Sequence, residues 1–200
     1  MDKSYEQLIT DLAKQKNIIT PKDLRAKGIP TIYLTRMVKA GKLERLRRGI
    51  YALPNRDFGE KQSIAEISKL VPNAVICLLS ALRFHELTTQ NPREIWIAVQ
   101  RESDIPLRSW PSVRVLRMSH DQFAAGIQHS EIEGIEIRVY SPAKTVADCF
   151  KYRNKVGLDV ALEALRDAWR QRKVTMDELW HYAKICRMSK VMRPYLESLV

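Results

Sequence analysis

Hydrophobic residues recur at helical spacing over the first forty positions and then alternate with polar residues. The apolar stripe over residues 4–16 predicts a first helix. Segments 20–27 and 30–40 predict two more, each followed by a glycine that favours a helix end. Residues 43–53 alternate around the basic turn Arg47–Gly49, which predicts a β-hairpin. Three helices and a hairpin in this order predict a winged helix-turn-helix, whose third helix enters a DNA major groove.

The remainder of the chain mixes helical and strand patterns, which predicts an α+β domain with a small sheet packed by helices. Strands are predicted where β-branched and aromatic residues cluster or alternate, at residues 94–99, 113–118 and 134–140. Helices are predicted at residues 63–71, 74–87, 142–152, 158–169 and 175–185, with a last short one ending at Leu199. We place the domain boundary in the turn-rich segment 54–59, so that the two domains span residues 1–56 and 60–200.

The chain of 200 residues has a net charge of +11, which favours a polyanionic partner. Much of this charge lies in the predicted winged helix. Residues 20–49 hold nine Lys or Arg and two acidic residues, a balance of 9 − 2 = +7. Binding of phosphates by such a surface is driven largely by counterion release. The charge pattern therefore favours double-stranded DNA as the partner. The alternatives are a solvated basic face and a winged helix that contacts protein.

The third predicted helix turns Leu34, Met37 and Val38 toward the core, which leaves its other side for the DNA groove. The residues expected there are Thr31, Tyr33, Arg36 and Lys39. Of these, Arg36 is the candidate for a bidentate contact with a guanine. Phosphate contacts, or insertion of the wing into the minor groove, are expected from Lys42, Arg45, Arg47 and Arg48.

A second basic surface is possible near the C-terminus, because residues 141–200 hold twelve basic and seven acidic residues, a balance of 12 − 7 = +5. Its candidate residues, as a nucleic-acid or antitoxin surface, are Lys144, Arg153, Lys155, Arg170 and Lys173. Acidic residues alternate with these bases along the predicted helices. The same pattern is therefore equally typical of ordinary solvated helix faces.

Patterns that mark enzymes and metal sites are missing from the sequence, so we expect no catalytic residue, metal ligand or cofactor. There is no Asp-x-Asp pair for a two-metal site and no HExxH spacing, and the three cysteines are far apart. An enzyme acting on nucleic acid would have to rely on His85 or on the pair Glu131 and Glu133, and this is the third alternative. We instead expect His85 in a core or at a hinge, and local hydrogen bonds for Thr145 and Asp148.

No apolar run reaches the ~20 residues that span a bilayer, and the N-terminus lacks a signal-peptide pattern. The cysteines are expected to be buried and reduced, as in a cytosolic protein. We therefore expect a cytoplasmic protein without a membrane partner. No leucine heptad favours a constitutive dimer, so a monomer that pairs on adjacent DNA repeats is expected.

Three stretches of the chain carry a family resemblance. They are MVKAGKLERLRRGIYAL at 37–53, LLSALRFHELT at 78–88 and YSPAKTVADCF at 140–150. Together they resemble the AbiEi family, the antitoxins of type IV toxin–antitoxin systems, and the match covers nearly the whole chain. The second stretch departs from the family pattern at Glu86, where a glycine is usual.

The resemblance implies a bacterial autorepressor whose N-terminal domain binds operator inverted repeats. It also implies that the C-terminal domain counteracts a nucleotidyltransferase toxin without a stable antitoxin–toxin complex. The competing interpretation is an RNA- or protein-binding module that acts on the toxin or its RNA target without operator-specific DNA binding.

Overall fold

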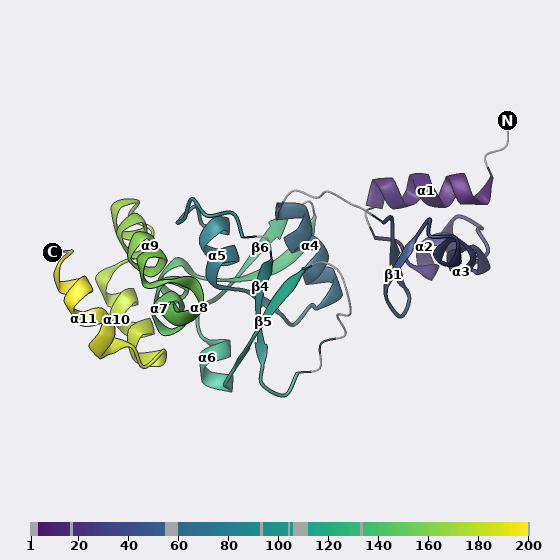
Figure 1. Ribbon diagram of the computed structural model, residues 1–200. Helices are drawn as coiled ribbons and strands as arrows, with labels where there is room; N and C mark the ends of the chain where they lie inside the picture. Colours follow the sequence, from purple (N-terminus) through teal and green to yellow (C-terminus); the bar gives the residue numbers. More distant parts are fainter. Residues whose placement is uncertain are drawn as a thin grey trace. The chain divides into compact units, whose positions relative to one another are not determined.

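The computed structural model describes residues 4–16, 18–54, 60–92, 94–103, 105, 112–132 and 134–199. The chain divides into two compact units (Figure 1). The first holds the described residues of 4–54 together with Ile105, and the second holds those of 60–103 and 112–199. The α+β class expected from the sequence is confirmed. The expected boundary segment lies outside the described residues except for Pro54.

The first unit contains three helices and a hairpin. The elements are α1 (Tyr5–Lys16), α2 (Pro21–Ala26), α3 (Ile32–Lys39), β1 (Glu44–Arg47) and β2 (Ile50–Ala52). Thr20 begins α2 with a capping box, in which its hydroxyl accepts from the Asp23 amide and the Asp23 carboxylate accepts from the Thr20 amide. At the start of α3, by contrast, the Thr31 side chain makes no capping hydrogen bond, and its backbone is already helical.

The hairpin turns through Arg48 and Gly49, and Gly49 has a φ of +77° that glycine tolerates without strain. Arg47 lies in β1 opposite Ile50 rather than in the turn, because a β-bulge follows Arg45 and shifts the register. Ile19 forms an isolated antiparallel bridge with Tyr51 of β2. The Ile19 amide donates to the Tyr51 carbonyl and the Tyr51 amide donates to the Ile19 carbonyl, each at 2.9 Å. The hairpin is thereby tied to the segment between α1 and α2.

The core of the first unit joins all these elements. Its buried residues are Ile9, Leu12, Ala13, Ile19, Leu24, Ile29, Leu34, Met37 and Leu43. Leu34 and Met37 are only 2% and 1% exposed, as the helical stripe of the sequence predicts. The order of helices, turn and hairpin is the one expected for a winged helix-turn-helix.

The second unit is built on a mixed five-stranded sheet with the order β5-β4-β3-β7-β6. Its strands are β3 (Val75–Ile76), β4 (Ile95–Gln100), β5 (Val113–Met118), β6 (Ile127–Ile132) and β7 (Ile135–Tyr140). The pairs β3–β7 and β4–β5 are parallel, whereas β3–β4 and β6–β7 are antiparallel. The β6–β7 hairpin turns through Gly134, which has a φ of +76°.

Helices pack on this sheet and on one another. They are α4 (Glu60–Leu70), α5 (Leu78–Phe84), α6 (His120–Ala124), α7 (Pro142–Lys151), α8 (Arg153–Val156), α9 (Leu158–Arg170), α10 (Met176–Ile185) and α11 (Ser189–Glu197). Helix α4 packs against β7, whereas α7 is surrounded by α5, α9 and α10. Figure 1 shows α9, α10 and α11 gathered at the end of this unit that carries the C-terminus. Eight of the ten residues of α7 are buried, so α7 is the central helix of the unit.

The helix expected over residues 74–87 is wrong. The apolar run is divided into strand β3, the residue Cys77 and helix α5, whose first residue Leu78 has a φ of +46°. A continuous apolar run is compatible with a buried strand or a buried helix, so periodicity alone does not distinguish them. The sheet decides, because β3 bonds to β4 on one edge and to β7 on the other.

Candidate nucleic-acid interface

One face of α3 is open to solvent. The exposed residues are Thr31, Ile32, Thr35, Arg36 and Lys39. Each is one or three positions after the one before it, so all five lie along a single side of the helix. Leu34 and Met37 lie on the opposite, buried side. This exposed α3 face contains three of the four residues expected from the sequence. It also contains Ile32 and Thr35, which the sequence interpretation missed.

Tyr33, the fourth expected residue, is half-buried and turns toward α1. Its ring centroid lies 5.2 Å from that of Tyr5. The guanidinium carbon of Arg36 lies 5.5 Å from the centroid of the same Tyr33 ring. A cation near an aromatic face is attracted by the ring quadrupole, so Tyr33 restricts where the Arg36 side chain points. Tyr33 therefore lies at the edge of the exposed α3 face, where it packs on α1 and contacts the Arg36 side chain.

The basic residues near the hairpin are arranged in two ways. Arg45 and Arg48 are exposed, on β1 and at the turn. Lys42 is exposed too, but its Nζ lies 2.6 Å from a carboxylate oxygen of Glu6 on α1. The backbone of Arg47 is in β1, and its side chain lies outside the described residues. A surface ion pair such as Lys42–Glu6 stabilises by only about 0–1 kcal/mol, so Lys42 is available to a phosphate.

The acid nearest to the start of α2 is fully engaged inside the unit. Partial burial acts to raise the pKa of Asp23, but hydrogen bonds from Lys16 and Thr20 outweigh it and hold that pKa below its usual range. Asp23 thus stays ionised while its charge is offset by Lys16 at 2.5 Å.

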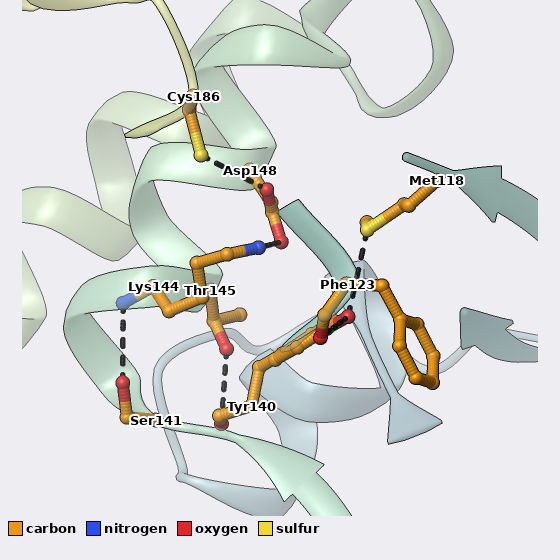
Figure 2. A network of polar contacts seen from close by, with 8 residues as sticks. All are labelled: Met118, Phe123, Tyr140, Ser141, Lys144, Thr145, Asp148 and Cys186. Atoms are coloured by element: carbon orange, nitrogen blue, oxygen red, sulfur yellow. Dashed lines mark hydrogen bonds and ion pairs between the residues drawn. The ribbon is translucent and has the colours of Figure 1, made fainter. Parts of the chain in front are cut away.

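The second basic surface expected from the sequence is wrong at Lys144. Lys144 is 0% exposed, and its ammonium pairs with the carboxylate of Asp148, also 0% exposed, inside the second unit. Figure 2 shows both side chains of α7 together with Tyr140 and Cys186. The Lys144 Nζ lies 4.1 Å from the centroid of the Tyr140 ring. Packing around α7 on every side removes this residue from any outer face.

The other four residues of that predicted surface have mixed surroundings. Lys155 is exposed. Arg170 is exposed and paired with Asp167 at 2.8 Å. The Lys173 ammonium donates to the carbonyl of His85 at 2.5 Å, and the half-buried Arg153 donates to the carbonyl of Phe150 at 3.0 Å. Two of the four therefore bond to the backbone of their own unit.

The second and third family-like stretches meet at one backbone carbonyl. The oxygen of Tyr140 accepts hydrogen bonds from His85 Nε2 at 2.7 Å and from Thr145 Oγ1 at 3.2 Å. Burial lowers the pKa of His85, which favours the neutral imidazole in this place. Figure 2 shows the Thr145 part of this arrangement, beside the Tyr140 hydroxyl, which donates to the Phe123 carbonyl at 2.9 Å. The local hydrogen bond expected for Thr145 agrees with these contacts, and His85 is half-buried with a backbone partner.

The buried pair on α7 extends to a cysteine. The thiol of Cys186, at the end of α10, donates to the Asp148 carboxylate at 3.2 Å. Burial raises the pKa of Asp148, and burial followed by the Asp148 charge raises the pKa of Cys186 to about 12. Cys77, Cys149 and Cys186 are free and buried, so none is a reactive thiolate.

Among the residues that the structure describes, no cluster of three His, Cys, Asp or Glu is placed to hold a metal ion. Glu131 is exposed on β6, and Glu133 lies outside the described residues. No helix in the described part of the chain is long and apolar enough to cross a membrane.

Comparison with known proteins supports the resemblance for the first unit. Residues 7–54 match the family model described as a transcriptional regulator, AbiEi antitoxin. No curated protein sequence matches the chain. The matched segment contains α1 to β2 and the whole exposed α3 face. The family points to a DNA-binding regulator. Residues 7–54 of this chain are thus similar to the AbiEi family of transcriptional regulators and antitoxins.

Proposed function

We propose that this protein is a sequence-specific DNA-binding autorepressor and an antitoxin that counteracts a nucleotidyltransferase toxin. The observation that carries the DNA-binding part is the exposed α3 face, where Arg36 and Lys39 stand clear of the core on a helix of the matched segment. A helix of this kind fits the major groove, and its exposed arginine suits the O6 and N7 acceptors of guanine.

The hairpin supplies the sequence-independent part of binding. With α3 in the major groove, Arg45, Arg47 and Arg48 contact phosphates on either side or insert into the minor groove, and Lys42 exchanges Glu6 for a phosphate. Operator inverted repeats would be bound by two copies that pair on the DNA. The proposed protein needs no cofactor and performs no catalysis.

The antitoxin part of the proposal belongs to residues 60–200. It is supported by the matched family of the first unit and by the two family-like stretches that meet at the Tyr140 carbonyl. Neutralisation is proposed to proceed without a stable antitoxin–toxin complex. Co-expression of the toxin with an Arg36→Ala variant tests whether the two functions belong to different parts of the chain. We expect neutralisation of the toxin to persist and repression of the operon to be lost.

The first experiment is a binding titration against the duplex just upstream of the gene, beside a scrambled duplex, at low and near-physiological salt. We expect binding that persists at the higher salt only on the upstream DNA. Arg36→Ala should cost about 1–3 kcal/mol on that duplex and reduce the preference over the scrambled one. Arg48→Ala should weaken binding to both and reduce the salt slope by about 1.

Arg166→Ala, an exposed arginine of the second unit, is the matched control and should change neither quantity. Equal, salt-sensitive binding of the wild type to both duplexes would contradict the proposal and direct attention to RNA or the toxin. An unchanged preference in Arg36→Ala would contradict the assigned groove face.

A further inference from the structure

The most exposed large hydrophobic side chain of the described residues stands on the exposed α3 face. Ile32 is 53% exposed, compared with 43% for Tyr5, 38% for Leu158 and 36% for Leu8. Single exposed apolar residues are common on protein surfaces and need no explanation by themselves. The position of Ile32 is what makes it informative, because it is the first residue of α3.

Ile32 is neither one of the buried core residues of the first unit nor one of the hydrophobic residues packed against that core. Its neighbour Tyr33 turns toward α1 and contacts Tyr5, whereas Ile32 points to the side that carries Arg36. Ile32 and Arg36 are four positions apart in the sequence, so they are neighbours on the helix surface. An isoleucine beside an arginine on an otherwise polar face fits a partner with apolar and hydrogen-bonding groups close together.

The edge of DNA in the major groove has this combination. Thymine presents its C5 methyl group there, and guanine presents two acceptors. Resting on the DNA-binding function proposed above, we infer that Ile32 determines specificity by packing on the methyl group of an operator thymine. The exposed Thr35 lies one turn along the same face and brings a second methyl group to it.

The helix geometry also limits where that thymine lies. One turn of α-helix advances about 5.4 Å. Successive bases on one strand are about 3.4 Å apart along the DNA axis. Ile32 and Arg36 are one turn apart, so the thymine lies one or two base steps from the guanine that Arg36 contacts.

The test replaces each thymine of the upstream duplex, one at a time, by deoxyuridine, which lacks only the methyl group. We expect one position at which wild-type affinity falls about fourfold, the loss for a buried group of this size. Ile32→Ala should bind the unmodified duplex about fourfold more weakly and be insensitive to deoxyuridine at that position. Ile32→Val should keep part of the discrimination, whereas Leu8→Ala, the exposed control on α1, should behave as wild type.

Three results would overturn the inference. If wild type prefers the upstream duplex but no deoxyuridine changes its affinity, the DNA-binding function stands and the role of Ile32 falls. If Ile32→Ala still loses the fourfold on deoxyuridine at that position, another residue contacts the methyl group. If the wild type does not prefer the upstream duplex over the scrambled one, the proposed function falls together with the inference.

Discussion

The arrangement at Lys144 shows how strongly one residue depends on its surroundings. Moving an ammonium group into a protein interior is costly unless a counter-charge and hydrogen bonds compensate it. Here the Asp148 carboxylate provides the charge, and the Tyr140 ring lies against the ammonium. Gly126 leaves the necessary space, because a Cβ at that position would lie 2.7 Å from the Cβ of Lys144.

Removing one member of this pair should destabilise the second unit. Lys144→Met leaves the Asp148 carboxylate buried without its cation, which costs about 3–5 kcal/mol. The double replacement Lys144→Met with Asp148→Leu removes both charges and should recover most of that loss. Urea denaturation at neutral pH measures both, with Lys155→Met as an exposed control that stays within about 0.5 kcal/mol. A double variant as unstable as the single one would show that packing, and not charge, causes the loss.

At the scale of elements, the C-terminal end of helix α5 contains a residue in the left-handed conformation. Two backbone hydrogen bonds end helix α5. The Glu86 amide donates to the Arg83 carbonyl at 3.1 Å, and the Leu87 amide donates to the Leu82 carbonyl at 2.8 Å. This is a Schellman motif, which needs a left-handed residue, and Glu86 has a φ of +57°. The glycine that the resemblance leads one to expect in place of Glu86 would adopt this conformation without strain.

Glu86→Gly should therefore stabilise the protein. A left-handed conformation costs a residue with a Cβ about 1–2 kcal/mol, and glycine's greater freedom in the unfolded chain offsets part of the gain. We expect the free energy of unfolding of the second unit to rise by about 1 kcal/mol. Glu86→Ala is the control, because it removes the carboxylate but keeps the strained Cβ, and should bring no gain. An equal gain in both variants would mean that the exposed carboxylate, and not the backbone, is unfavourable.

Each of the two units has a hydrophobic cluster of its own among the described residues. One contains Ile9 to Leu43 and belongs to the first unit. The other runs from Val75 to Leu196 and belongs to the second unit. Cooperative unfolding requires a shared core, so clusters that each belong to a single unit predict a separate unfolding transition for each unit.

Calorimetry of the full chain should resolve these transitions and assign them. Thr20→Ala removes the capping box of α2 and should destabilise the first unit by about 1 kcal/mol, which lowers one transition by about 4–8 °C. Lys144→Met should lower only the other. A single transition that both substitutions shift would show that the two units unfold together.

Local features of this protein were determined by its sequence alone. Helix periodicity located α1 and α3, the residues Thr20 and Thr175 began helices with capping boxes, and the basic turn formed a hairpin. The helical features depend on residues within about four positions of one another, and the hairpin pairs residues no more than eight positions apart, which is why the sequence is sufficient. The α+β class follows from the same periodicities.

Tertiary structure alone decided which side chains face solvent and which apolar run becomes a strand. Segment 74–87 became β3 and α5 because strands from distant parts of the chain offered hydrogen bonds on both sides of Val75 and Ile76. Lys144 was buried because α7 lies at the centre of its unit, and Tyr33 turned inward because Tyr5 of α1 lies beside it. That contact leaves Ile32 on the exposed face. Burial is set by partners far away in the chain, and the spacing of neighbouring residues carries no record of them.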